Sequence, residues 1–205
     1  TWSPAGPVYA AGRIRNMVVD KNDPSGKTLY VGATSSGIFK STDAGSNWAP
    51  INDQGFVRNI SYMAQAVDGT IWASTGEGFL RYGQKAKAQK GTGLYKLNIT
   101  TNELVKVQDS AIVGDVINRI ACSPIDNKYM AVASNKGIMV STDGGASFSA
   151  ANLSGYTTTV NVTFGMDVKF DANGILYCTI GNERGHIALA GLPNFVNVAS
   201  KVFKS

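Results

Sequence analysis

Short apolar runs, separated by glycine and polar turn residues, recur along the whole chain. The segment LYVGATSSGIFKSTD contains two such runs around Gly37, and YMAVASNKGIMVSTD repeats them around Gly137. The same pairing recurs around Gly93 and Gly185. Runs this short, rich in β-branched and aromatic residues and bounded by turn residues, predict β-strands rather than helices.

The spacing of these four glycines predicts a repeated unit. The intervals are 56 residues from Gly37 to Gly93, 44 to Gly137 and 48 to Gly185, which bracket the ~40–50 residues of a propeller blade. One more short strand precedes each pair and another follows it, so each unit holds strands A, B, C and D. The pattern therefore predicts an all-β fold, a β-propeller of four-stranded antiparallel blades. One domain, 1–205, is expected to hold blades at 12–51, 56–108, 116–153 and 163–199, with an extra outer strand in 1–10.

The first residues resemble the end of a blade. TWSP at Thr1–Pro4 echoes NWAP at Asn47–Pro50, so Trp2 is expected to open a D strand. Either this strand closes the ring against the last blade, or the chain is part of a larger propeller. The second reading is favoured, because NFVNV at 194–198 reads as a D strand for the fourth unit. The open sheet edges would then need further blades of the same or another chain.

Two loops carry a more specific pattern, Ser-x-Asp-x-Gly-x-x-aromatic. Its members are Ser41, Asp43, Gly45 and Trp48 in the first loop and Ser141, Asp143, Gly145 and Phe148 in the second. The pattern resembles the Asp-box, or BNR repeat, and the chain is similar to propellers of the sortilin and xyloglucanase type and to secreted bacterial BNR-repeat proteins. The resemblance implies an extracellular, cell-surface or periplasmic location. It leaves the function open, because sialidases, xyloglucanases, sorting receptors and non-catalytic proteins all carry the pattern.

A structural role is expected for these loops. Each lies between strands C and D, where an aspartate can accept backbone N–H groups and fix a tight turn. The aromatic residue is expected to pack between sheets. A calcium loop requires several oxygen ligands, whereas STDAGSNW offers one carboxylate. No metal and no cofactor are therefore predicted.

The opposite face of the disc, which carries the B–C loops and D–A connections, is where the resemblance implies ligand binding. The second blade has a long basic insertion there, TGEGFLRYGQKAKAQKGT at 75–92. Such a loop is a candidate docking site for an acidic protein or glycan, or else a solvated loop without a partner. Its candidate binding residues are Arg81, Tyr82, Lys85, Lys87 and Lys90.

Three arginines form a second candidate site. Arg13, Arg58 and Arg119 lie near the starts of predicted A strands, the innermost strands of the blades. They are candidates to bind an anion such as a carboxylate at the channel mouth, or to brace neighbouring loops. Sialidases use an arginine cluster in this way, but their Phe-Arg-Ile-Pro motif is absent, and GRIRN is the nearest text.

Catalysis is the alternative to binding. Glycoside hydrolysis needs two carboxylates roughly 5–10 Å apart, and the candidate acids on the loop face are Asp53, Glu77, Asp109 and Asp115, with Asp167 on the fourth inner strand. The single histidine, His186, disfavours Ser–His–Asp chemistry. We therefore predict a non-catalytic binding or scaffold propeller that engages a protein or glycan through the B–C/D–A face. The alternative is a partial domain of a xyloglucanase- or sialidase-like glycoside hydrolase.

The composition argues against nucleic acid and the membrane interior as partners. The net charge of +5 and pI near 9.2 are mildly basic, and scattered lysines fit solubility better than nucleic-acid binding. No apolar run approaches the ~20 residues of a membrane helix, so no membrane insertion is predicted. Cys122 and Cys178 lie in apolar runs and are expected to be buried free thiols, although a single bridge stays open. Glycosylation sequons, relevant only in a glycosylating host, occur at Asn59, Asn98, Asn152 and Asn161.

Overall fold

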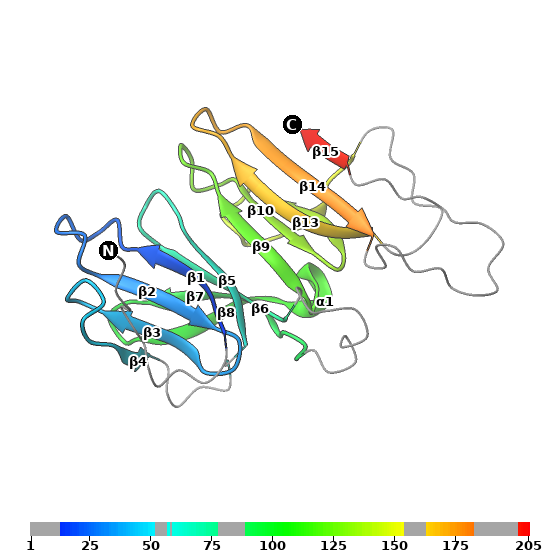
Figure 1. Cartoon of the computed structure of the whole chain (residues 1–205). Coiled ribbons are helices and arrows are strands. Elements are labelled where there is room, and N and C mark those ends of the chain that lie inside the picture. The colour runs from blue at the N-terminus through cyan, green and yellow to red at the C-terminus, as the bar shows by residue number, and fades with distance from the viewer. Residues whose placement is uncertain (1–12, 52–56, 58, 78–88, 154–162, 183–200) are drawn as a thin grey trace, which may run out of the picture.

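Antiparallel β-sheets make up nearly all of the described chain (Figure 1). The computed structural model describes residues 13–51, 57, 59–77, 89–153, 163–182 and 201–205. Within these residues the only α-helix is α1 (Ser110–Val113), and no helix is long and apolar enough to cross a membrane.

The first three sheets each contain four strands in chain order. The first sheet is formed by β1 (Ile14–Val19), β2 (Leu29–Ala33), β3 (Gly37–Ser41) and β4 (Ala49–Ile51). The second is formed by β5 (Ile60–Gln65), β6 (Ile71–Thr75), β7 (Gly93–Asn98) and β8 (Glu103–Asp109). The third is formed by β9 (Ile117–Cys122), β10 (Met130–Ser134), β11 (Gly137–Ser141) and β12 (Ser149–Ala150). The predicted A-B-C-D meander is confirmed in these sheets.

The fourth sheet differs from the prediction. It contains β13 (Thr163–Phe170), β14 (Leu176–Asn182) and β15 (Lys201–Lys204) in that order. The C position is taken by β15, which lies beyond the predicted blade limit of residue 199. The strands expected at 185–190 and 194–198 fall outside the described residues. The Leu176 N–H donates to Ser205 Oγ at 3.1 Å, which gives Ser205 the register of Ser41 and Ser141, the partners of Leu29 and Met130.

The first strands of the four sheets lie next to one another. β1 contacts β5, β5 contacts β9, and β9 contacts β13. Each has one extra residue relative to its partner strand at the same place, a β-bulge, and these extra residues are Arg15, Ser61, Asn118 and Met166. A bulge bends its strand and re-aims the side chains beyond it. The repeated bulge therefore gives all four inner strands a common bend near their beginnings.

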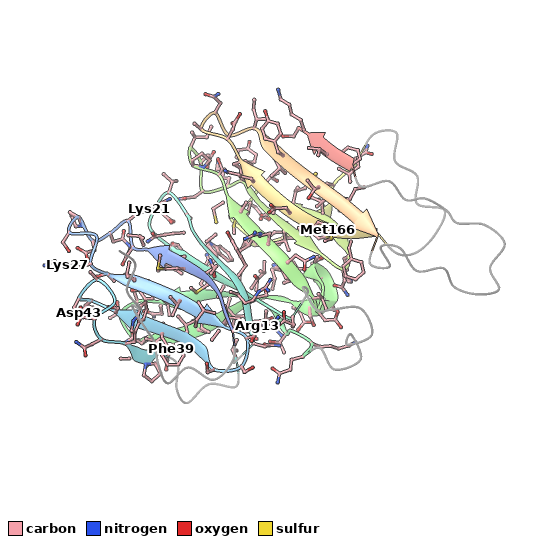
Figure 2. The ribbon with its side chains drawn as sticks, in the orientation of Figure 1. Arg13, Lys21, Lys27, Phe39, Asp43 and Met166 are labelled. Atoms are coloured by element: carbon pink, nitrogen blue, oxygen red, sulfur yellow. The ribbon has the colours of Figure 1, made fainter. Side chains whose placement is uncertain are left out.

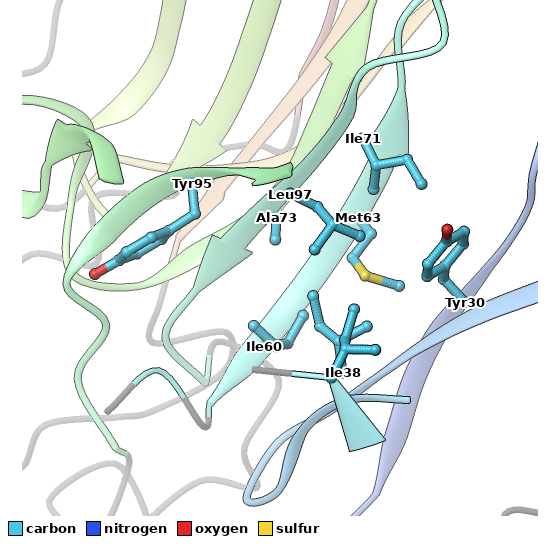
Figure 3. Close-up of a cluster of buried hydrophobic side chains, with 9 residues drawn as sticks. Tyr30, Ile38, Ile60, Met63, Ile71, Ala73, Tyr95 and Leu97 are labelled. Atoms are coloured by element: carbon cyan, nitrogen blue, oxygen red, sulfur yellow. The ribbon is translucent and has the colours of Figure 1, made fainter. Parts of the chain in front are cut away.

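The core lies between neighbouring sheets. Tyr30 and Ile38 of the first sheet pack with Ile60, Met63 and Ile71 of the second (Figure 3). Similar clusters join the second sheet to the third and the third to the fourth. Full burial of one such side chain contributes about 1.5–3 kcal/mol, so the contacts between sheets dominate the stability of the fold.

One glycine shows how closely the sheets approach. A Cβ built on Gly32 would lie 2.6 Å from Ile60 Cγ2, well inside van der Waals contact. Glycine is thus required in LYVGA because the second sheet packs directly on that backbone.

Cys122 and Cys178 are free thiols, half-buried and buried respectively. Burial raises the pKa of Cys122 to about 12, so this thiol stays protonated and unreactive in the folded protein.

Candidate functional site

The two loops Ser41–Trp48 and Ser141–Phe148, which we call the STD loops, satisfy their own polar groups. Ser41 Oγ donates to Asp43 Oδ1 at 2.8 Å and accepts the Gly45 N–H at 2.9 Å. Asn47 donates its backbone N–H to Asp43 Oδ1 at 2.8 Å and its side-chain amide to Oδ2 at 2.7 Å. Both carboxylate oxygens of Asp43 are therefore occupied within the loop.

The second STD loop repeats this network. Ser141 bridges Asp143 and the Gly145 N–H, and Ser147 bonds both Asp143 oxygens. Hydrogen bonds from Asn47 and Ser147, each four residues after the aspartate that it contacts, lower the pKa of Asp43 and Asp143 to about 2. Among the described residues, no group of three or more His, Cys, Asp or Glu side chains could hold a metal ion. The carboxylates of these loops close turns.

The second STD loop also joins two blades. A Cβ on Gly145 would lie 2.4 Å from Trp72 Cη2 in the second sheet. The side-chain amide of Gln108, also in the second sheet, donates to the carbonyls of Gly145 and Ala146 at 3.2 and 2.6 Å. Phe148 packs against the same apolar cluster. The loop is therefore part of the contact between the second and third blades.

The candidate site lies at the opposite ends of the strands. In Figure 2, Arg13 lies at one end of the first sheet, and Lys27 and Asp43 lie at the other. Several residues proposed from sequence for this side lie outside the described residues, namely Asp53, Arg58, Arg81, Tyr82, Lys85, Lys87 and His186. Arg13, Lys90 and Arg119 are described, together with the two ends of the basic insertion.

The base of the insertion is tied to its neighbours. Asn59 donates to the Lys90 carbonyl at 2.8 Å, and the Gly91 N–H donates to the Asp115 carbonyl at 2.6 Å. Lys90 Nζ lies 2.9 Å from Asp115 Oδ2, and Asn135 donates to Asp115 Oδ1 at 2.6 Å. Partial burial acts to raise the pKa of Asp115, but the bonds from Lys90 and Asn135 outweigh it and the pKa is lowered.

Glu77, at the start of the insertion, is held by arginines of the first blade. Its side chain is only 8% exposed; Arg13 Nη2 lies 2.8 Å from Oε2 and Arg15 Nη1 lies 3.9 Å from Oε1. Burial lowers the pKa of Arg15, the Glu77 carboxylate opposes that change, and the charges of Arg13 and Arg119 add to it. Arg15, which the spacing of Arg13, Arg58 and Arg119 did not single out, is therefore close to both described members of that set.

A row of polar side chains crosses the inner strands just after the bulges. Asn16, Tyr62, Arg119 and Asp167 hold equivalent positions in this row. Asn16 donates to the Met63 carbonyl at 2.7 Å and accepts its N–H at 3.0 Å. The Arg119 guanidinium lies 4.3 Å from the centre of the Tyr62 ring, and its Nε lies 3.2 Å from Asp167 Oδ1. Arg119 thus contacts the blades on both sides.

The acids considered for catalysis have partners here. Glu77 pairs with Arg13, Asp115 with Lys90 and Asp167 with Arg119. Asp109 pairs with Lys106 at 2.5 Å and accepts the Ala111 N–H at the start of α1. The N–H bond and the bond from Lys106 lower the pKa of Asp109. A general acid in glycoside hydrolysis needs a raised pKa, which neither Asp109 nor Asp115 has.

Comparison with known proteins places the fold. No protein-family model matches the chain. No curated protein sequence matches it either. Among solved structures, a GH74 enzyme from Niastella koreensis aligns with a TM-score of 0.57 at 16% identity, over 82% of this chain and 28% of its own. The GH74 xyloglucanase from Xanthomonas campestris aligns with a TM-score of 0.57 at 19% identity, over 84% and 28%.

The chain has the β-propeller fold. A third similar structure is an auxiliary nutrient-binding protein from Bacteroides ovatus, with a TM-score of 0.55 and 12% identity, over 80% of this chain and 35% of that one. The chain thus spans about a quarter to a third of the length of these proteins. At these identities the likeness describes the fold.

Proposed function

We propose that this propeller is a non-catalytic binding module that engages a glycan on the face carrying Arg13, Glu77, Lys90 and Arg119. The observation that supports this proposal is a set of ion pairs with lysine or arginine side chains, formed by Glu77, Asp109, Asp115 and Asp167. Carboxylates held in this way are suited to orienting neighbouring side chains, whereas a hydrolase needs one carboxylic acid that keeps its proton.

The chemistry of this face suits hydroxyl groups. Guanidinium and ammonium groups donate hydrogen bonds, and carboxylate and amide oxygens accept them, so sugar hydroxyls could use both kinds of group. Arg13 and Lys90 have side chains 56% and 80% exposed, which leaves donors accessible to a ligand. The nutrient-binding and xyloglucanase neighbours support a carbohydrate as the ligand. We also propose an extracellular or periplasmic location, the setting named for another structural neighbour, the extracellular domain of a putative hybrid two-component system.

Isothermal titration calorimetry with xyloglucan oligosaccharides tests the binding proposal. We expect Arg13→Ala and Lys90→Ala each to weaken binding by about tenfold or more, the value of one charge-assisted hydrogen bond. Lys27→Ala removes the same charge from an exposed position at the other end of the first sheet and should leave the affinity unchanged. Equal losses in all three variants, or no binding by the wild-type protein to this and other glycans, would contradict the proposal.

A glycoside hydrolase fragment is the second candidate, supported by the similarity to GH74 enzymes. It predicts that the protein releases reducing ends from xyloglucan and that Glu77→Gln or Asp115→Asn abolishes the release. Binding without any release would favour the non-catalytic module, whereas release that depends on either acid would establish the enzyme.

A further inference from the structure

Arg119 on β9 is held on two sides by the neighbouring blades. Its guanidinium carbon lies 4.3 Å from the centre of the Tyr62 ring on β5, and its Nε lies 3.2 Å from Asp167 Oδ1 on β13. The first contact uses the flat face of the guanidinium group and the second uses its inner edge. The second and fourth blades therefore fix the orientation of this side chain.

The outer end of the same guanidinium group is available to a ligand. Within the described part of the chain, neither Nη atom of Arg119 donates a hydrogen bond, and the side chain is 35% exposed. The N–H groups of the two Nη atoms match the two oxygens of a carboxylate and can bind it bidentately. Because the side chain is already ordered, a ligand that binds here loses little affinity to the ordering of Arg119.

The arginines of the first blade share one carboxylate. Arg13 Nη2 lies 2.8 Å from Glu77 Oε2, whereas Arg15 Nη1 lies 3.9 Å from Oε1, which is beyond hydrogen-bond distance. Glu77 Oε1 is buried and accepts no hydrogen bond from the described residues. Burial lowers the pKa of Arg15 against the opposing charge of Glu77, and the charges of Arg13 and Arg119 lower it further. The three guanidinium groups thus lie close enough to repel one another.

The ion pairs on this face leave positive charge in excess. Asp167 offsets the charge of Arg119, but the single charge of Glu77 is divided between two arginines. Lys90 and Asp115 balance each other. Among these pairs, one positive charge is therefore left over, on the first blade and next to Arg119. An anion placed at the Nη atoms of Arg119 would be attracted by that charge and would reduce the repulsion between the arginines.

We infer that the ligand of this face is an acidic glycan, one that carries uronate carboxylates, and that Arg119 binds one carboxylate through both Nη atoms. The inference rests on the proposed glycan-binding function and names its class of glycan. Arg13 and Lys90, with side chains 56% and 80% exposed, are left to contact hydroxyl groups or a second carboxylate of the same chain of sugars.

Isothermal titration calorimetry with a matched pair of ligands tests the inference. An oligosaccharide of galacturonic acid carries a carboxylate on each sugar, and its methyl ester keeps the rings and hydroxyls but has no charge. We expect the wild-type protein to bind the acid form about tenfold or more tightly than the ester, the value of a charge-assisted hydrogen bond. Raising the salt concentration from roughly 0.05 to 0.5 M should reduce this difference, because exposed charges are screened.

Two variants should change the preference in opposite directions. Arg119→Lys keeps the positive charge but loses the bidentate fork, so it should lose most of the preference for the acid form. Asp167→Asn removes the negative charge beside Arg119, so it should strengthen binding of the acid form and leave binding of the ester unchanged. A misfolded protein would not produce that gain. Lys27→Gln, at the other end of the first sheet, is the control and should leave both affinities unchanged.

Failure of this inference is distinguishable from failure of the proposed function. Equal binding of the acid form and the ester, a preference that survives in Arg119→Lys, or weaker binding of the acid form by Asp167→Asn would overturn the inference and leave glycan binding in place. Tighter binding of an oligoglutamate peptide than of the acid oligosaccharide would overturn both in favour of an acidic protein. An absence of binding to the acid form, the ester and xyloglucan oligosaccharides would also overturn both.

Discussion

Replacing Gly145 with alanine tests whether the STD loops hold blades together. Gly145 has φ +85°, and its missing Cβ would lie 2.4 Å from Trp72 Cη2 and 3.2 Å from Met130 Sδ. Trp72 and Met130 are both 2% exposed, so neither side chain has room to move away. The substitution therefore combines a backbone cost with a steric clash between the second and third blades.

The neighbouring residue separates these two costs. Gly144 has φ +73°, but the nearest atom to its missing Cβ is the Asn127 carbonyl at 3.6 Å. The first STD loop has Ala44 at the same place with φ 59°, so alanine is accepted in this conformation. We expect Gly144→Ala to cost about 1–2 kcal/mol for the left-handed backbone. Gly145→Ala should cost that amount and about 1–3 kcal/mol more for overpacking.

Urea denaturation followed by tryptophan fluorescence measures the difference. With unchanged m-values, the free energy of unfolding should fall further for Gly145→Ala than for Gly144→Ala. In thermal unfolding, each additional kcal/mol should lower the midpoint by about 2–4 °C for a chain of this size. Equal losses in the two variants would refute the steric argument and leave only the backbone conformation as the cause.

Three other predictions use the same fold. Asp43 and Asp143 have pKa values of about 2, below the ordinary 3.8, so their contribution to the free energy of unfolding is present above pH 4 and lost as the pH falls from about 4 toward 2. The double Asp→Asn variant should therefore lose less of its thermal midpoint over that pH range than the wild-type protein. An equal loss in both proteins would contradict this prediction. Asn16→Ala leaves the Met63 backbone groups without partners and should cost about 1–3 kcal/mol in urea denaturation, whereas a neutral result would show that water replaces the bonds. Cys122, with a pKa of about 12, should resist iodoacetamide at pH 8 until the protein unfolds, and rapid labelling of the native protein, read by mass spectrometry, would show that the strand opens.

The repeat was readable from the sequence because glycine has to recur where the chain turns. Gly37 and Gly137 open the third strands at φ +80° and +96°, a conformation that few other residues adopt. The third strand of the fourth sheet was predicted at Gly185, because GHIALA has the same glycine-apolar pattern as GIFKST and GIMVST, whereas in the structure β15 pairs with β14. The signal was present: KVFKS repeats GIFKS and GIMVS, and its last serine takes the register of Ser41 and Ser141.

The site was less predictable because it depends on a bulge and on contacts between blades. The sequence placed Arg13 and Arg119 near the starts of inner strands without a common register, and the structure shows that Arg119 shares its register with Asn16. A bulge shifts the alternation of side chains by one residue, and nothing in the local sequence marks it. The ion pairs of Glu77 were likewise not predictable from the sequence, because Arg13 and Arg15 precede it by more than 60 residues and belong to another sheet.

The aspartates and glutamates of this protein have two distinct uses, and the difference bears on where a ligand can act. In the turns at one end of the sheets, the carboxylates bond backbone N–H groups of their own turn, as in Asp23, Asp43, Asp68, Asp126, Asp143 and Asp171. At the opposite end, Glu77, Asp115 and Asp167 each form an ion pair with a lysine or arginine of the preceding blade.

A ligand that binds at this end, among these ion pairs, would therefore bind across blade boundaries. Since it would bind the folded arrangement and not the unfolded chain, a saturating glycan at about 100 times its Kd should add about 2.7 kcal/mol to the free energy of unfolding. A ligand bound by a single blade would raise the free energy of unfolding by the same amount. The location of the protected amides therefore distinguishes the two cases. Hydrogen exchange of the amides in β1, β5 and β9 should slow together if the glycan joins the blades, whereas slowing confined to one sheet would place the site within that blade.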